Sequence, residues 1–230
     1  WVIDGEKTFI TSGMRADWYT VAVRTGGPGA AGVSLLGIER DTPGFTRSEL
    51  KKMGWWASDT AELHFDDCRV PASNLIGAEG QAFPLIMRNF NGERLTLAAS
   101  ACGAAQACLE DAVAWARERK TFGQPLIAHQ VIRHKLVDMA ERIEATRALI
   151  DDLASRLDGG EQPVAQTAMA KNYAARTMQF CADAAVQILG GSGYMRGVRV
   201  ERIYREVKVM MIGGGAEEVL KDLAARQLGL

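Results

Sequence analysis

Several features that mark specialised classes of protein are missing from the sequence. Its 27 lysines and arginines are balanced by 28 aspartates and glutamates, so it has no basic excess of the kind that nucleic-acid binding requires. Its longest apolar runs, such as Val33 to Ile38, are far too short to cross a bilayer. The amino-terminal residues include acidic and basic side chains where a signal peptide has an apolar core. We therefore expect no nucleic-acid partner and no membrane span, and a location in a bacterial cytoplasm or the mitochondrial matrix.

Metal and redox motifs are missing as well. The four cysteines form no CxxC pair, and the three histidines have no ligand-like spacing. These residues are Cys68, Cys102, Cys108 and Cys181, and His64, His129 and His134. We expect no metal site, and we interpret the cysteines as small buried apolar side chains in a reducing compartment.

The composition is that of an ordinary globular protein, with 47% apolar and 24% charged residues in a chain of 230. Residues 1–77 are short apolar stretches, rich in β-branched and aromatic residues and separated by turn sequences such as Asp4-Gly5 and Pro43-Gly44. Strands are predicted over residues 1–10, 18–24, 33–39 and 61–65. This half is typical of an antiparallel β-domain with hairpin connections.

The hydrophobic period changes from that of strands to that of helices near Gly80. Helices are predicted near residues 81–119, 129–158, 163–189, 198–209 and 215–228. Amphipathic segments of this length pack as an up-down bundle. The sequence therefore predicts an α+β fold, with an antiparallel β-domain over residues 1–77 and an α-helical bundle over residues 78–230. Because the chain begins at Trp1, without an initiator methionine and already inside a predicted strand, we interpret it as part of a longer protein.

Glu93 is a candidate catalytic base. A helical glutamate is usually solvated and paired with a lysine or arginine three or four positions away, but those positions hold Asn89, Phe90, Thr96 and Leu97. The helical stripe that contains Glu93 is otherwise mostly apolar, so we expect its carboxylate to be buried. Burial in apolar surroundings raises the pKa of a carboxyl group, as a proton-abstracting base near neutral pH requires. An ion pair with another helix explains the residue equally well.

Two glycine clusters and two arginines also have two interpretations each. Gly190-Gly191-Ser192-Gly193 follows a predicted helix and Gly213-Gly214-Gly215 precedes one, but neither matches GxGxxG within a βαβ unit. Each cluster either binds a phosphate or ring carbonyl at a helix N-terminus or is simply a helix end and a tight turn. Arg119 either contacts a pyrophosphate or complements the dipole of a helix C-terminus. Arg94 either orients a substrate or forms a structural salt bridge. For the glycines and Arg119, the residues alone favour the structural interpretation.

An ordered series of short motifs resembles the acyl-CoA dehydrogenase family and covers essentially the whole chain. The series runs Trp1-x-x-x-Gly5-x-Lys7-x-Phe9-Ile10-Thr11, Asp59-Thr60, Phe65-Asp66, Val70-Pro71, Glu93-Arg94-Leu95, Arg119-Lys120-Thr121-Phe122-Gly123, His129-Gln130, Gln187-Ile188-Leu189-Gly190-Gly191-Ser192-Gly193-Tyr194, Arg205-Glu206-x-Lys208 and Ile212-Gly213-Gly214-Gly215. Each motif alone is weak, whereas their order is highly specific.

The resemblance implies a protein of three parts: an amino-terminal helical domain, a middle β-domain and a carboxyl-terminal four-helix bundle. This chain is expected to hold the later part of the β-domain and the whole bundle. The resemblance also implies FAD bound between the β-domain and the bundle, and a homotetramer built as a dimer of dimers. The implied reaction is α,β-dehydrogenation of an acyl-CoA thioester, after which electrons pass to an electron-transferring flavoprotein.

The resemblance assigns FAD contacts to individual residues. Thr11 is expected to hydrogen-bond the flavin near N5, and Phe9 replaces a tryptophan that stacks beside the isoalloxazine ring. Ala216 stands where a threonine is common, so one side-chain hydrogen bond is lost there. The remaining implied contacts are Arg119, Thr121 and Phe122 at the pyrophosphate, Gln130, Gln187, Gly190 and Gly191 at the adenosine of a neighbouring subunit, and Gly215 and Glu217 at the flavin.

The same resemblance places the catalytic base on Glu93. Many members carry the catalytic glutamate at the position of Gly214, whereas the isovaleryl-CoA and long-chain-like members carry it on the first bundle helix, in a Glu-Arg-Leu segment. Glu93 is therefore expected to remove the α-proton while the β-hydride passes to flavin N5. Phe90, Asn91, Arg94 and Gly214 are expected to shape a substrate cavity with room for a long or branched acyl chain.

Two other interpretations stay open. One is a related flavoenzyme that acts on a non-thioester substrate such as a nitroalkane, or a flavin monooxygenase, although the retained Glu93 favours dehydrogenation. The other is a truncated, non-catalytic chain that oligomerises through an exposed apolar face.

Overall fold

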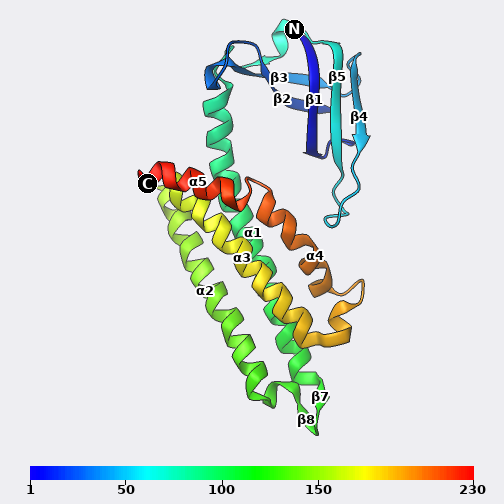
Figure 1. Cartoon of the computed structure of the whole chain (residues 1–230), viewed down its shortest axis with the longest axis vertical. Helices are drawn as coiled ribbons and strands as arrows, with labels where there is room; N and C mark the ends of the chain where they lie inside the picture. The colour runs from blue at the N-terminus through cyan, green and yellow to red at the C-terminus, as the bar shows by residue number, and fades with distance from the viewer. The chain divides into compact units, whose positions relative to one another are not determined.

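Six strands form the amino-terminal part of the chain in a computed structural model that describes all 230 residues (Figure 1). They are β1 (Val2–Thr11), β2 (Trp18–Arg24), β3 (Val33–Glu39), β4 (Phe45–Glu49), β5 (Thr60–Arg69) and β6 (Leu75–Ile76). They make two three-stranded antiparallel sheets, in the orders β1-β5-β4 and β2-β3-β6. The predicted antiparallel β-domain is confirmed. The sequence pattern did not reveal β4, because Phe45 is its only buried residue.

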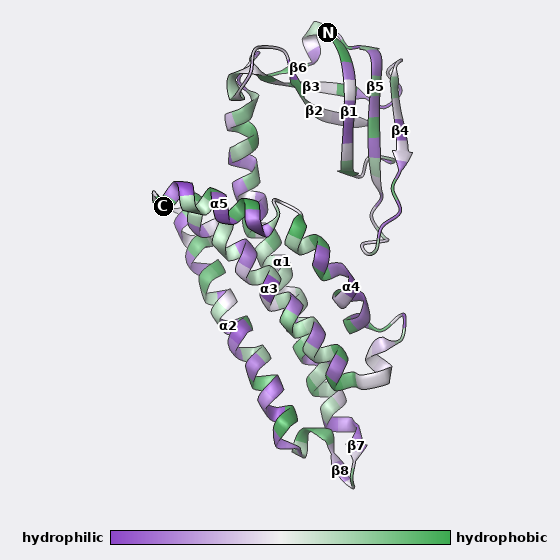
Figure 2. Cartoon of the chain, in the orientation of Figure 1, coloured by the Kyte–Doolittle hydropathy of each residue, from purple (hydrophilic) through white to green (hydrophobic).

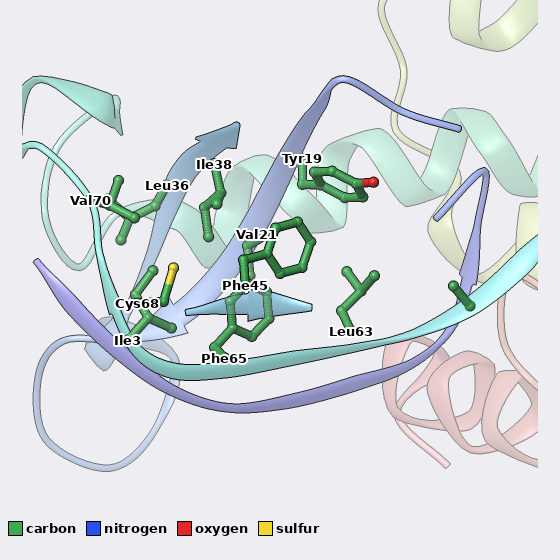
Figure 3. Packing of buried hydrophobic residues seen from close by; sticks show 11 residues of the cluster. Ile3, Tyr19, Val21, Leu36, Ile38, Phe45, Leu63, Phe65, Cys68 and Val70 are labelled. Carbon is green, nitrogen blue, oxygen red and sulfur yellow. The ribbon is translucent and has the colours of Figure 1, made fainter. Parts of the chain in front are cut away.

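One hydrophobic core joins the two sheets. Side chains alternate between buried and less buried along β3, where Leu36 and Ile38 are fully buried. The rings of Phe45 and Phe65 stack with their centroids 4.8 Å apart, and Tyr19 meets Phe45 edge-on at 4.8 Å (Figure 3). Because Tyr19 belongs to the second sheet, this aromatic cluster packs one sheet against the other.

Five helices follow the strands. They are α1 (Ala82–Glu118), α2 (Gln130–Asp158), α3 (Val164–Leu189), α4 (Arg199–Ile212) and α5 (Glu217–Leu228), and a hairpin of β7 (Lys120–Thr121) and β8 (Gln124–Pro125) lies between α1 and α2. Helix α3 contacts α2, α4 and α5, and alanine is the commonest of its buried residues. Hydrophilic and hydrophobic residues are mixed along each helix in Figure 2. The predicted helical bundle is confirmed, with α5 packed on α3 as an additional helix.

The chain divides into two compact units, residues 1–89 and 90–230. The division falls inside α1 and beyond residue 77, where the sequence pattern changes, because the first residues of α1 group with the β unit. All four cysteines are buried free thiols, as the sequence indicated. None of the helices combines the length and the apolar character that a membrane crossing needs.

The aromatic cluster supports a stability prediction. Phe65→Ala should lower the free energy of unfolding of the β unit by about 3–5 kcal/mol, because it removes a buried ring and leaves a cavity. Phe9→Ala is the matched control, since the Phe9 side chain is 77% exposed and its loss should change stability by less than about 0.5 kcal/mol. Denaturant unfolding without added cofactor measures both values, and equal losses would contradict this account of the core.

Candidate functional site

The end of β1 presents two of the predicted site residues on irregular backbone. The pairing of β1 with β5 shifts between Lys7 and Ile10, which marks a β-bulge, and Phe9 within it has a φ of 59°. A bulge turns the strand locally and re-aims its side chains. Phe9 is accordingly 77% exposed, and Thr11 is exposed two residues later. The structure therefore places an aromatic ring and a hydroxyl at the surface of one strand end.

Asp59 holds the turn that follows this strand end. Its carboxylate accepts a hydrogen bond from the Met14 backbone N–H at 2.7 Å and forms an ion pair with Arg15. The Ser12 N–H also donates to the Asp59 carbonyl at 3.1 Å. The Met14 hydrogen bond, with a further contribution from Arg15, lowers the pKa of Asp59. The Asp59 carboxylate thus holds the turn at Met14 and Arg15.

Glu93 lies on α1, but not on the face that packs into the bundle. The buried residues of this stretch are Asn91, Arg94 and Ala98, followed by Ala101, Ala105 and Cys108 at helical spacing. Glu93 itself is exposed. Our expectation that its carboxylate is buried in this chain is therefore wrong. The helical stripe that contains Glu93 is displaced by one residue from the packing seam, which is the row of α1 residues buried against the bundle. That seam begins with two polar side chains, Asn91 and Arg94.

Arg94 occupies a structural position on that seam. Its side chain is buried, and its Nε donates a hydrogen bond to the Gly214 carbonyl at 3.0 Å. The guanidinium also lies over the Phe90 ring, 5.8 Å from the centroid. Burial lowers the pKa of Arg94, and the neighbouring Glu93 carboxylate opposes that shift. The residue therefore connects α1 to the turn between α4 and α5.

Asn91, one helical turn before Arg94, is 3% exposed, and neither atom of its amide has a hydrogen-bond partner. Buried amides are normally satisfied, so an unsatisfied one calls for a specific explanation. A bound group that supplies the missing partners is one such explanation, in keeping with the substrate contact that the sequence predicts for this residue.

The turn between α4 and α5 requires glycine for two reasons. Gly214 and Gly215 have φ values of 70° and 114°, which side-chain-bearing residues rarely adopt. A Cβ atom would also lie 2.6 Å from Leu97 Cδ1 at position 214, and 2.9 Å from Leu220 Cδ2 at position 215. Gly214 therefore packs against α1 beside Arg94 and Leu97, directly next to Glu93 in the helix. One of the two positions at which the resemblance allows a catalytic glutamate, Gly214, therefore packs against the helix that carries the other, Glu93, and only Glu93 has a carboxylate.

Helix α3 supplies three side chains to the same turn, and the sequence analysis missed them all. Lys171 is 1% exposed, and its Nζ donates to the carbonyls of Met211 at 3.1 Å and Gly215 at 2.8 Å. The Asn172 amide donates to the Glu217 carbonyl at 3.0 Å, and Arg176 pairs with the Glu217 carboxylate. A signal was available, because Lys171 falls at the spacing of an apolar, alanine-rich helix face.

The Glu217 carboxylate is already occupied by cations. Arg176 Nε lies 3.0 Å and Lys221 Nζ 2.7 Å from its oxygens, and these hydrogen bonds, Arg176 first, lower its pKa to about 2. The Glu217 side chain is therefore not free for the cofactor contact predicted at this position, and only backbone groups remain for that contact. Helix α5 starts there with Ala216 as N-cap and no side-chain cap, so its first N–H groups are available as donors.

A second group of predicted residues lies at the opposite end of the bundle (Figure 1). Phe122, at the tip of the β7–β8 hairpin, is 97% exposed with a φ of 50°. His129 holds the hairpin, because its Nε2 is 3.1 Å from Thr121 Oγ1 and its Nδ1 is 3.3 Å from Gln124 Nε2. Arg119 is exposed where α1 ends, and Gln130 is exposed where α2 begins.

The end of α3 completes this distal group. Gln187, Gly190 and Gly191 are exposed, and a Cβ at either glycine would meet open space, so a ligand can approach the backbone closely. An open hollow of about 360 Å³ lies beside them, between the ends of α1 and α3 and the start of α4. Its lining includes Trp115 and the ion-paired Asp111 and Arg199.

The predicted site residues of the helical unit thus form two separate groups. Glu93 and the end of α1 at Glu118 lie on one helix, at a separation of roughly 40 Å for a rise of 1.5 Å per residue. Glu93, Arg94, Gly214 and Gly215 come together at one end of the bundle. The hairpin and the end of α3 come together at the other, so one copy of the chain does not join them.

Comparison with known proteins is consistent across the whole chain. Residues 1–68 match the model of the acyl-CoA dehydrogenase middle domain, and residues 80–229 match that of the acyl-CoA dehydrogenase C-terminal domain. The chain is 39% identical to cyclohexane-1-carbonyl-CoA dehydrogenase of Geobacter metallireducens, over 99% of the chain and 60% of that protein. It is 41% identical to an acyl-CoA dehydrogenase of Bacillus subtilis, over 99% of the chain and 61% of that protein.

Solved structures show the same likeness. A putative acyl-CoA dehydrogenase from Mycobacterium smegmatis superposes with a TM-score of 0.97 at 47% identity, covering 99% of this chain and 60% of the other. Butyryl-CoA dehydrogenase from Megasphaera elsdenii superposes with a TM-score of 0.94 at 38% identity, covering 100% of this chain and 60% of the other. The chain therefore spans about three fifths of the length of these relatives.

The Glu217 ion pair generates a pH prediction. Arg176→Gln should lower stability by about 1 kcal/mol at neutral pH, since Arg176 is half exposed and its pair with Glu217 is partly screened. Because the pKa of Glu217 is depressed from 4.5 to about 2 in the folded chain, the pair stabilises above pH 4.5 and is lost as the pH falls toward 2. The difference in Tm between wild type and variant should shrink over that window.

Arg226→Gln is the control for this measurement, because the Arg226–Asp222 pair is exposed on both sides and should add little. A Tm difference for Arg176→Gln that stays constant between pH 6 and pH 2.5 would contradict the role given to Glu217.

Proposed function

The chain belongs to the acyl-CoA dehydrogenase family, and from this premise we propose that it is part of an FAD-dependent enzyme that removes hydrogen from the α and β carbons of an acyl-CoA thioester. The observation that carries the proposal is the arrangement at Glu93. Glu93 is an exposed carboxylate on α1, and its helix neighbours Arg94 and Leu97 contact a glycine turn that is held in place by buried cations. This is the arrangement expected of members that carry the base on the first bundle helix.

The residues present fit FAD. The bulge in β1 exposes the Phe9 ring, an apolar face that a ring system can stack on, and places the Thr11 hydroxyl near it. The uncapped start of α5 offers backbone donors for a ring carbonyl. At the distal end, Arg119 and Thr121 supply donors for a pyrophosphate, and the open glycines at 190 and 191 allow close approach. When bound, FAD supplies the oxidising equivalent of the reaction.

Glu93 is proposed to remove the α-proton of the acyl chain. Its exposure in this chain leaves the carboxylate accessible, and Gly214 lets the turn approach α1 so closely that a Cβ there would clash with Leu97. Arg94 is bound to the Gly214 carbonyl, so it is proposed to shape the cavity by fixing the turn. Asn91, with both amide atoms buried and unpartnered, is proposed to meet the substrate. Exclusion of water by the bound substrate keeps the carboxylate basic.

The substrate is proposed to be a long or branched acyl-CoA. The support comes from relatives, because the space at Gly213 and Gly214 is already filled: a Cβ would lie 3.1 Å from the Val209 carbonyl oxygen and 2.6 Å from Leu97 Cδ1. Two similar proteins are named for substrates that are not straight chains: the Geobacter cyclohexane-1-carbonyl-CoA dehydrogenase, and isobutyryl-CoA dehydrogenase of Dictyostelium discoideum, which is 40% identical over 99% of this chain and 56% of that protein.

Two copies of the chain are proposed to complete each cofactor site, within a homotetramer that is a dimer of dimers. The support is the separation of roughly 40 Å along α1 between Glu93 and the hairpin. Phe122, 97% exposed on a hairpin that His129 holds, offers an apolar ring that a second copy is proposed to cover. An electron-transferring flavoprotein is the proposed electron acceptor. A structure of an electron-transferring flavoprotein from Acidaminococcus fermentans contains a chain that matches this one with a TM-score of 0.94 at 37% identity.

A second candidate function is oxidation of an acyl group that is not carried on CoA. Two structural neighbours favour it: the prolyl acyl carrier protein oxidase AnaB, at 28% identity and a TM-score of 0.94, and PigA with FAD and proline, at 27% and 0.95. An anaerobic screen of acyl-CoA esters and their pantetheine counterparts separates the two candidates, because only one carrier should bleach the flavin efficiently.

The base assignment has a direct test in the full-length enzyme. Glu93→Gln should retain bound flavin but slow flavin bleaching by acyl-CoA by at least about a thousandfold, because the amide cannot accept the α-proton. Glu141→Gln is the matched control, an exposed glutamate on α2 that should leave bleaching unchanged. Anaerobic stopped-flow absorbance follows the reaction. Wild-type bleaching rates in Glu93→Gln would overturn the assignment.

A further inference from the structure

Buried polar side chains of the helical unit gather around the α4–α5 turn. Arg94, Lys171 and Asn172 are all buried and all donate to backbone carbonyls of the turn or of the first residue of α5. Lys171 is the largest of the fully buried side chains in the protein. A buried ammonium group is costly unless it is hydrogen-bonded, so its position on an otherwise apolar helix face demands a reason.

The two acceptors of Lys171 lie at the two ends of the α4–α5 connection. Its Nζ donates to Met211, near the end of α4, at 3.1 Å and to Gly215, at the end of the turn, at 2.8 Å. One side chain therefore fixes the distance between the points where the chain leaves α4 and enters α5. Glycine turns are conformationally permissive, so this bridge supplies rigidity that the turn itself lacks.

Charges around Lys171 do not explain it as a simple ion pair. Arg94 on α1 is a second buried cation near it, and Glu217 on α5 is the nearby carboxylate. Glu217 is itself paired with Arg176 and Lys221. Burial, with a further contribution from Arg94, lowers the pKa of Lys171 to about 8, although Glu217 opposes the shift. The contacts within hydrogen-bond distance are the two carbonyls.

The two cations set the direction of the peptide groups in the turn. All peptide bonds of the chain are trans, and in a trans peptide the C=O and the following N–H point in opposite directions. Arg94 draws the Gly214 carbonyl toward α1, so the N–H of Gly215 points away from Arg94. Lys171 draws the Gly215 carbonyl toward α3, so the N–H of Ala216 points away from Lys171. Two successive donors are thereby turned away from the helices that hold them.

We propose that Lys171 is a positioning residue, which together with Arg94 locks the Gly213–Gly215 turn so that the N–H groups of Gly215 and Ala216 stand fixed as donors to a carbonyl oxygen of the bound reactants. The inference rests on the proposed function, because the turn lies beside Glu93. The carbonyl belongs either to the acyl thioester or to the flavin ring, and both would be oriented by the same pair of donors.

The first test measures the turn directly and does not depend on activity. In the full-length protein as purified, Lys171→Met should raise hydrogen-exchange rates in the peptide covering residues 211–217 by about tenfold or more, with α2 peptides unchanged. Methionine keeps the unbranched shape of lysine and removes the donors. Lys221→Met is the matched control, since Lys221 binds the Glu217 carboxylate and no carbonyl of the turn. It should leave exchange at residues 211–216 within about twofold of wild type.

Exchange at the turn that is unchanged in folded Lys171→Met, or raised equally over the whole bundle, would overturn the inference. If Lys171→Met does not fold, Lys171→Gln replaces it. The glutamine amide retains donors but no charge, and it should give intermediate exchange confined to the same peptide. Wild-type exchange in that variant would be equally damaging to the proposal.

The second test identifies the carbonyl in the FAD-loaded enzyme. If the donors serve the thioester, Lys171→Met should lower kcat at least about tenfold, with KM for acyl-CoA and FAD affinity little changed. If they serve the flavin ring, FAD affinity and the flavin reduction potential should change as well. No change in any of these values would overturn the positioning role. Failure of the proposed function is separately visible, because acyl-CoA would then not bleach the wild-type flavin.

Discussion

Backbone carbonyls in the interior of the helical unit need donors, and at the α4–α5 turn those donors are buried cations. Arg94 serves Gly214 and Lys171 serves Gly215. The turn can approach the helices closely enough for these bonds only because it has no side chains, as the near-contacts with Leu97 and Leu220 show. The glycines, the buried cations and the geometry of the turn therefore depend on one another, because the buried carbonyls need donors and only a turn without side chains comes close enough to them. The position of Glu93 beside this turn follows from this dependence.

In the β unit, a carboxylate holds irregular backbone in place. The end of β1 leaves regular pairing at a bulge, and Phe9 and Ser12 both have positive φ values, 59° and 60°. Such backbone persists only where the surroundings over-determine it. Asp59 does so through the Met14 N–H and Arg15, while its own carbonyl accepts from Ser12. In each unit, a charged side chain thus holds irregular backbone next to candidate site residues, at the end of β1 in one and at Gly214 and Gly215 in the other.

The candidate site residues of the helical unit form two groups that lie far apart. A long helix carries Glu93 at one end and the β7–β8 hairpin beyond the other. This separation is the support for the proposal that two copies of the chain complete each cofactor site. At the distal end, Phe122 and the glycines at 190 and 191 are exposed, and His129 holds the hairpin that carries Phe122.

The sequence predicted the class of fold, the four longest strands and all five helices, because hydrophobic period and turn residues are local properties of the chain. The family followed from the ordered series of short motifs. It did not reveal β4 or the β7–β8 hairpin, whose strands are too short or too polar to show a period. It also placed Glu93 on the buried seam, whereas the seam lies one residue away, at Asn91 and Arg94. Which face of α1 packs inward became clear from the packed helices alone, as did the contact of Lys171 with Gly215, 44 residues away in sequence. Periodicity shows that a face exists, but the neighbouring helices determine what that face meets.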